Sequence, residues 1–415
     1  MWKTIRSIAS LLLSYGLLLL ANGLFATLLG LRSKLEGFST ETTGFIMAGY
    51  FFGLLLGALY AVRVVAAVGH IRSFAAFASI MSVAVLAHLL RIDPFTWLAL
   101  RIVAGFCMAG MVMVAESWIN ERSTNRTRGR VLSLYMVTHY LGSGLGQLLL
   151  TVASPAEFQL FVISSIIFSI ALVPILLTRA SSPKPVSPQR MRFRDLFAVS
   201  PVGVVGTIVA GLNNASLHSL GPIYAADSGL SIAQVSAFMA SIILGGMVLQ
   251  FPIGRLSDRL DRRTILILVA LATSACALGI VWATREASWP MFLFAAAYGG
   301  FAFTVYPLST AQVNDRADPD RLVQVAAGLL VAYGIGAIAG PIVASQIMGR
   351  AGPQGLFLFI TTVAFSLVLF TVLRMVIRPR GRARKAPFLP LGSVGISGKQ
   401  LYLAALKSLL RKKEN

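Results

Sequence analysis

Charged side chains are scarce in this chain. Of its 415 residues only 12% are Asp, Glu, Lys or Arg, about half the share found in soluble globular proteins. Hydrophobic residues make up 56%, and the mean hydropathy is +0.78. This composition excludes a water-soluble globular protein.

Cysteine is almost absent, since the sequence contains only two. Cys107 and Cys276 both fall inside apolar runs and have no metal-ligand spacing, so we expect neither a structural disulfide nor a metal site. The sequence also lacks a Walker loop, a zinc pattern and a nucleophile elbow. We therefore expect no cofactor and no enzymatic activity.

Long apolar runs are what the sequence does contain. Their length of roughly twenty residues is what a helix needs to cross a bilayer. The first run is too long for the apolar core of a signal peptide. We predict an all-α membrane protein with twelve transmembrane helices near 8–31, 43–62, 73–91, 95–119, 131–152, 158–178, 200–223, 232–253, 264–284, 289–312, 323–348 and 355–377.

The chain divides at residues 179–199, where Pro, Ser and five basic residues predict a cytoplasmic linker. It separates two six-helix lobes, 1–178 and 200–377, and a basic tail follows at 378–415. Motifs recur between the halves at one constant spacing: NER at 120–122 recurs as NDR at 314–316, and Gly105, Gly142 and Gly146 recur as Gly299, Gly336 and Gly340. Because six is even, both copies enter the bilayer in the same orientation.

Lys and Arg gather in alternate connections between the predicted helices. Basic residues near the ends of spans resist translocation, so both termini are predicted to be cytoplasmic. The net charge of +21 then reflects topology and attraction to an anionic inner leaflet, and we expect no nucleic-acid partner. In the tail, KQLYLAALKSLLRKK suits either a helix on the membrane surface or a disordered end.

A charged segment, GRLSDRLDRRT, stands between two apolar runs at Gly254–Thr264. We expect Asp258 near the end of one helix and Asp261 to cap the next. The segment resembles the signature loop of the major facilitator superfamily, with Gly254, Asp258, Arg259, Arg262 and Arg263 at matching places. RIVAGFCMAG at 101–110 resembles the family's fourth-helix pattern, and GHIRSFAAF and AESWINERS are similar to its YcaD-like branch.

The resemblance covers residues 8–377 and implies alternating access between the two lobes. It implies that the signature loop is a gate that keeps the cytoplasmic side of the protein closed in the outward-open state. We add the repeated polar motifs to this predicted gate, which then comprises Gly254, Asp258, Arg259, Arg262, Arg263, Glu121, Arg122, Asp315 and Arg316. The alternative is that these charges only fix topology. The first half keeps bases in Ala61–Arg72 but lacks the carboxylate, so the gate is predicted to be asymmetric.

The resemblance also implies that the first, fourth, seventh and tenth helices line the substrate cavity. Arg101 lies about eight residues into its helix, a costly position that calls for an anion or other acceptors. It could instead snorkel to the outer interface or bond to backbone carbonyls. Paired amides near the bilayer centre need partners, which could be a ligand or another helix. The predicted cavity residues are Asn22, Arg101, Asn213, Asn214, His218 and Tyr298.

Acids inside the spans are nearly absent, and Glu116 is the only one we place there. With His139, which titrates near neutrality, it is the best candidate for proton coupling. Glu116 could instead belong to an ion-pair cluster with nearby arginines, and His139 could be a core residue.

The sequence therefore predicts a monomeric secondary transporter of the bacterial inner membrane. We expect proton-coupled movement, with export favoured, of a small amphipathic or anionic solute. One alternative is uptake of an organic acid or an amino-acid-like metabolite. An alternative of another class is a scaffold or sensor of the same shape that does not transport.

Overall fold

The computed structural model describes residues 2–124, 127–177, 191–285, 289–377 and 388–392. Within these ranges the protein is helical and has no β-strand. The first lobe contains α1 (Trp2–Leu35), α2 (Thr40–Val68), α3 (His70–Leu90), α4 (Pro94–Glu121), α5 (Arg128–Leu148), α6 (Gln159–Ile170) and α7 (Val173–Leu176). The second contains α8 (Phe193–Val199), α9 (Pro201–Asp227), α10 (Ile232–Arg259), α11 (Arg262–Arg285), α12 (Pro290–Asn314), α13 (Leu322–Ala351) and α14 (Gly355–Ile377).

The twelve predicted spans each correspond to a helix, with α6 and α7 together forming the sixth. Ten helical segments of the described chain are long and apolar enough to cross a membrane. The short helix α8 joins α9 at a bend of 115°, and together they make an eleventh candidate. The remaining helix, α5, is the most polar of the twelve because His139, Ser143 and Gln147 interrupt its apolar residues.

Local sequence explains where several helices begin. Ser231 and Gln234 form a reciprocal capping box at the start of α10, and the side chain of Asp93 accepts a hydrogen bond from the Thr96 amide at the start of α4. Such caps satisfy amide groups that have no partner within the helix. Between α2 and α3 the chain turns at Gly69, whose φ of 88° suits glycine.

The predicted linker region is partly helical, because α8 occupies 193–199. Leu196 is fully buried and packs with Val204, Val325 and Leu329 in a small apolar cluster. This packing fixes α8 against the second lobe. Residues 178–190 lie outside the described chain, as do residues 393–415, on which the predicted surface helix falls.

The two lobes repeat the same close helix contacts. In the first lobe, Gly142 and Gly146 of α5 meet the backbone of α1 at Gly16 and Leu20. Their counterparts on α13 of the second lobe meet the backbone of α9 in the same way: Gly336 at Ile208 and Gly340 at Leu212. A Cβ at any of these four glycines would collide with backbone, so small residues are required for the helices to approach.

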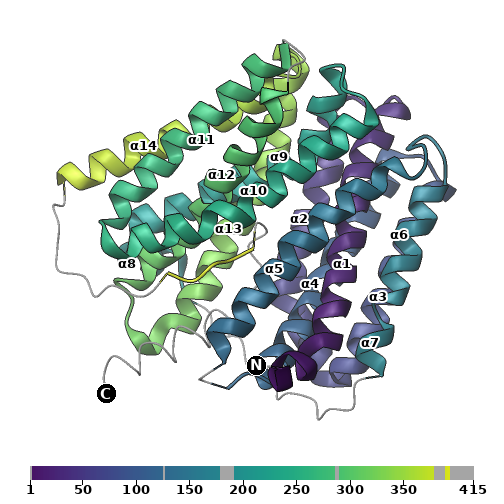
Figure 1. Ribbon diagram of the computed structural model, residues 1–415, viewed down its shortest axis with the longest axis horizontal. Coiled ribbons are helices and arrows are strands. Elements are labelled where there is room, and N and C mark those ends of the chain that lie inside the picture. The colour runs from purple at the N-terminus through teal and green to yellow at the C-terminus, as the bar shows by residue number, and fades with distance from the viewer. Residues whose placement is uncertain (1, 125–126, 178–190, 286–288, 378–387, 393–415) are drawn as a thin grey trace.

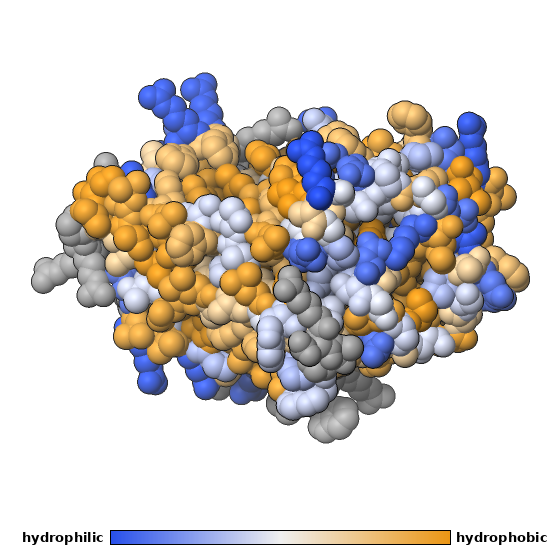
Figure 2. Space-filling model, turned by 90° about the horizontal axis from the view of Figure 1, so that it is seen from above, coloured by the Kyte–Doolittle hydropathy of each residue, from blue (hydrophilic) through white to orange (hydrophobic). Residues whose placement is uncertain are grey.

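Large apolar side chains cover much of the outer surface of the bundle. Leu90, Phe95, Leu177 and Val376 are each more than 70% exposed, at 88%, 81%, 77% and 73%. Seen from the end of the bundle, hydrophobic side chains spread over much of the visible surface, with hydrophilic ones scattered among them (Figure 2). An apolar perimeter of this kind is what a helix bundle presents to lipid.

The ends of the bundle differ. We call the end that carries the loops after α2, α4, α10 and α12 the basic end, and the other the distal end. The lobes lean together at the distal end, at the top of Figure 1, and apart at the basic end below. At the distal end Lys34 of the first lobe forms an ion pair with Asp227 of the second, and a Cβ on Gly44 of α2 would meet Ser345 of α13. The structure is therefore closed distally.

Candidate substrate cavity

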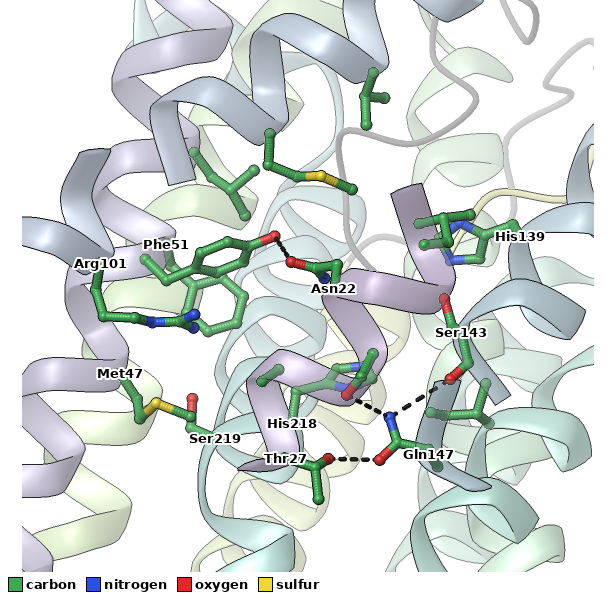
Figure 3. Close-up of a pocket in the computed structure, with 18 residues that line it drawn as sticks. Asn22, Thr27, Met47, Phe51, Arg101, His139, Ser143, Gln147, His218 and Ser219 are labelled. Atoms are coloured by element: carbon green, nitrogen blue, oxygen red, sulfur yellow. Dashed lines mark hydrogen bonds between the residues drawn. The ribbon is translucent and has the colours of Figure 1, made fainter. Parts of the chain in front are cut away.

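A cavity of about 760 Å³, including its mouth, lies between the lobes. Polar side chains of the lining come from five helices: α1, α2, α4 and α5 of the first lobe and α9 of the second (Figure 3). Its polar or charged lining residues are Asn22, Thr27, Tyr50, Arg101, His139, Ser143, Gln147, His218 and Ser219.

Arg101 is the dominant group in the cavity. Its side chain is buried, with 2% of the residue exposed, and its guanidinium carbon lies 4.3 Å from the centre of the Tyr50 ring and 5.7 Å from that of Phe25. Cation–π contacts stabilise the charge in part. However, Nε and Nη1 have no hydrogen-bond partner among the described residues. A carboxylate or phosphate is the kind of group that satisfies such donors with charge-assisted hydrogen bonds.

Close packing between α2 and α4 sets the position of Arg101. A Cβ on Gly53 of α2 would collide with the backbone at Ile102, and one on Gly105 of α4 would collide with the carbonyl of Tyr50. The two helices therefore touch at backbone distance beside Arg101. This contact places the Tyr50 ring against the guanidinium and leaves the nitrogen donors toward the cavity.

Hydrogen bonds between helices of the first lobe fix two amides in the lining. Tyr50 donates from its hydroxyl to Asn22 Oδ1 at 3.0 Å. Gln147 on α5 donates from Nε2 to the Gly23 carbonyl of α1 at 3.0 Å and accepts from Thr27 at 2.5 Å (Figure 3). These bonds hold α1, α2 and α5 in register around the cavity.

His218 and Ser219 are the polar residues of α9 in the lining. The His218 ring stacks on Phe303, with centroids 5.5 Å apart and planes 8° apart. Its Nε2 has no partner among the described residues. Nearby, Ser236 of α10 donates across the lobes to the carbonyl of Gln147 at 2.7 Å.

Three of the six predicted cavity residues lie elsewhere. Asn22, Arg101 and His218 line the cavity, whereas Asn213, Asn214 and Tyr298 are buried outside its lining. Asn213 is 3% exposed and Tyr298 is fully buried. Tyr298 packs edge-on against Phe357, with ring centroids 5.7 Å apart. These three side chains face other helices because helix rotation, which sequence depth does not fix, decides which face meets the cavity.

The two predicted proton carriers are connected. Glu116 on α4 accepts a hydrogen bond from the Tyr135 hydroxyl at 2.7 Å, and the Tyr15 hydroxyl lies 2.9 Å from His139 Nδ1. The rings of Tyr15 and Tyr135 stack with centroids 4.2 Å apart, so ring stacking joins the two hydrogen-bonded pairs. We call this chain the tyrosine relay: Glu116, Tyr135, Tyr15 and His139. It runs from near the basic end of α4 to the cavity lining.

The predicted gate residues form a network in the second lobe. Arg262, whose side chain is 1% exposed, binds Asp315 at 2.8 Å and Asp258 at 3.0 Å. Asp261 caps α11 by accepting from the Arg263 amide at 2.9 Å, as the sequence predicts. Two other members of the predicted gate lie on α10: Gly254 is near its end and Arg259 is its last residue. Two more belong to the first lobe: Glu121 is the last residue of α4 and Arg122 directly follows it.

Arg316, next to this network, donates to the Ser200 hydroxyl at 3.4 Å. Burial and the nearby Arg263 lower the pKa of Arg316, and the carboxylates of Asp315 and Asp261 oppose that change. The cations at this end are therefore held close together by acids of the same lobe. The role of the network as a gate stays a prediction.

The sequence reasoning missed Tyr50, Gln147 and Thr27 in the lining. Tyr50 and Gln147 were missed because only the first, fourth, seventh and tenth helices were considered, although α2 and α5 also reach the cavity. Thr27 lies on α1, one of the helices considered. The low hydrophobicity of α5 was the available signal, because a polar face in a span usually lines a cavity or a helix interface.

Known proteins resemble this chain along most of its length. The sequence profile of the Major Facilitator Superfamily matches residues 11–204 and 203–413. The "uncharacterized MFS-type transporter YcaD" of Escherichia fergusonii is 30% identical over 331 residues, 79% of this chain and 85% of that protein. An "uncharacterized MFS-type transporter" of Yersinia pestis (strain Pestoides F) is 31% identical over 328 residues, 78% of this chain and 84% of that protein.

Solved structures agree on the fold. The nucleoside transporter NupG superimposes with a TM-score of 0.74 at 12% identity, covering 88% of this chain and 98% of that one. A bacterial homologue of the human lysosomal transporter Spinster, in an inward-facing and unoccupied conformation, gives a TM-score of 0.66 at 16% identity and covers 98% of both chains.

The fold and the cavity thus define an integral membrane transporter with two pseudo-symmetric six-helix lobes. The chain belongs to the Major Facilitator Superfamily, and its relatives include YcaD, as the motifs predict.

Proposed function

We propose that this protein is a secondary transporter that moves a small amphipathic anion by alternating access. The observation that carries this proposal is Arg101, which is buried at the cavity with two unused donor nitrogens. A substrate carboxylate or phosphate would satisfy those donors with charge-assisted hydrogen bonds.

The rest of the lining supports a solute with an apolar portion. Met47, Phe51, Leu54 and Met108 face the same cavity. Methionine side chains adapt to varied shapes, and aromatic rings provide flat apolar contact. The cavity therefore combines one strong anion site with an apolar wall.

A binding screen on purified protein tests the proposal. Thermal unfolding would be measured with aromatic and aliphatic carboxylates and phosphates, each paired with its neutral amide or alcohol. Anionic members should stabilise the protein more than their neutral pairs. Arg101→Met should weaken binding about 10- to 100-fold, since a charge-assisted bond to a buried cation is lost.

Arg63→Met is the matched control, because Arg63 also lies over a tyrosine ring, with 5.1 Å between its guanidinium carbon and the Tyr60 centroid, but is exposed. It should leave anion binding unchanged. Anion binding that survives Arg101→Met would overturn the proposed site.

The tyrosine relay is the physical reason to propose proton coupling. It arranges an acid, two hydroxyls and an imidazole in order, with a hydrogen bond at each end and stacked tyrosine rings between them, and such groups can pass protons. Its His139 end lines the cavity, where protonation would respond to a bound anion.

We further propose that the basic end faces the cytoplasm of a bacterial inner membrane, following the positive-inside rule. Proteoliposomes loaded with a screened anion would report coupling and direction. A pH gradient that drives anion flux supports proton coupling, and flux unaffected by the gradient contradicts it. Movement away from the basic end would support the predicted export.

A further inference from the structure

A short piece of the C-terminal tail lies between the lobes. Leu389 and Leu391 are only 8% and 2% exposed, although they lie beyond the last transmembrane helix. Figure 1 shows this segment as an extended piece of yellow chain that runs beneath the second lobe toward the first. We call residues 388–392, Phe-Leu-Pro-Leu-Gly, the strap.

Both lobes hold the inner end of the strap. The carbonyl of Leu391 accepts a hydrogen bond from Gln250 Nε2 of α10 at 2.8 Å and from the Tyr140 hydroxyl of α5 at 3.5 Å. Gln250 and Tyr140 therefore meet at this carbonyl from opposite lobes. The Tyr140 ring lies 5.2 Å from the ring of His139, so the strap ends next to the cavity lining.

The outer end of the strap binds the signature loop. The amide of Phe388 donates to Asp258 Oδ1 at 2.9 Å, on the same carboxylate oxygen that binds Arg262. The Phe388 ring lies where a Cβ on Gly254 would be. From Gln250 to Asp258 is eight residues, about 12 Å of helix, so the strap runs along two turns of α10.

We propose that the strap is a built-in wedge that holds the basic end open and blocks access from that end to the cavity. Closing the basic end requires α5 and α10 to approach where the strap now lies, so the strap must leave first. The carboxylate of Asp258 is then freed from the Phe388 amide. The wedge thus links the position of the tail to the signature loop, and it does so whatever solute is carried.

Thiol labelling of the cavity tests this wedge without any solute. Ser143→Cys places a thiol in the lining, in a protein whose Cys107 and Cys276 are replaced by alanine, and a sulfonated maleimide is the probe. Adding Leu391→Glu should undock the strap and raise the labelling rate about tenfold, because a carboxylate is costly at a buried apolar position. Leu391→Met, of similar volume, should label like the parent. Equal rates for the glutamate and methionine proteins would overturn the proposal.

A disulfide gives an independent readout in case the glutamate protein does not fold. Gly254→Cys with Phe388→Cys brings two thiols to positions already in contact. Oxidation should fix the strap in place and slow labelling of the Ser143→Cys thiol, and reduction should restore the rate. Each single variant under the same oxidant is the control. Labelling that is as fast when oxidised as when reduced contradicts the wedge, and neither result depends on the proposed substrate.

Discussion

Lobe one and lobe two share their helix contacts but differ in where they place charge. Lobe one supplies Arg101, His139 and most of the polar cavity lining. Lobe two supplies the buried network of Arg262 with Asp258 and Asp315 at the basic end. The two lobes thus share the glycine contacts between helices, whereas their charged side chains differ.

The loops after the second helix of each lobe show the same contrast. In lobe one the turn is made by Gly69, with φ of 88°, and the neighbouring bases lack an acid. In lobe two Asp261 caps the following helix and Asp258 binds Arg262. The first turn needs only backbone conformation, whereas the second also stores an ion-pair network that could change partners between states.

The largest expected effect is on the stability of lobe two. Arg262→Met should lower the free energy of unfolding by about 3–5 kcal/mol, since it removes the buried cation that Asp315 and Asp258 share. Denaturant unfolding in detergent measures it. Arg255→Met, in the same loop but exposed above Phe251, should change stability by less than about 0.5 kcal/mol. Similar losses for both would show that the network is not structural.

The second effect falls on lobe one and on proton movement. Tyr135→Phe removes the hydroxyl between Glu116 and Tyr15 while keeping the stacked ring. Proton flux accompanying a transported anion should fall at least about tenfold, with anion affinity unchanged within about twofold. Tyr60→Phe, at a 40% exposed position, is the control. Unaltered flux in the Tyr135→Phe protein would remove the relay from the mechanism.

A third comparison sets the two loops against each other. Asp258→Asn weakens the bonds to Arg262 and to the Phe388 amide and should change labelling of Ser143→Cys about fivefold, since the Asp258 side chain is 38% exposed and its ion pair is modest. Arg72→Met in lobe one should have little effect. Equal changes would end the idea of an asymmetric gate.

The smallest effect is expected at Tyr298. Its hydroxyl is buried and has no partner among the described residues, so Tyr298→Phe should leave stability unchanged or raise it by up to about 1 kcal/mol. Anion binding should not change, because Tyr298 does not line the cavity. Tyr50→Phe is the contrasting variant and should weaken binding, since Tyr50 contacts both Asn22 and Arg101.

Sequence reasoning located Arg101 because an arginine inside an apolar run is conspicuous and costly. It found His139 and Glu116 for the same reason. It did not connect them, because Tyr15 and Tyr135 are far from them in sequence and meet only when α1, α4 and α5 pack. Depth along a helix also placed Asn213 and Tyr298 correctly within the bundle but not on the cavity face.

By itself, the sequence determined the class of this protein: twelve mostly apolar helices and their approximate positions, two repeated lobes and the family. Those features follow from helix length, hydropathy and local capping, which depend on neighbouring residues. The tertiary structure decided which polar groups face one cavity, that the lobes meet at the distal end and stand apart at the basic end, and that residues 388–392 lie between the lobes. Such facts depend on helix rotation and on contacts between distant segments, which local patterns do not encode.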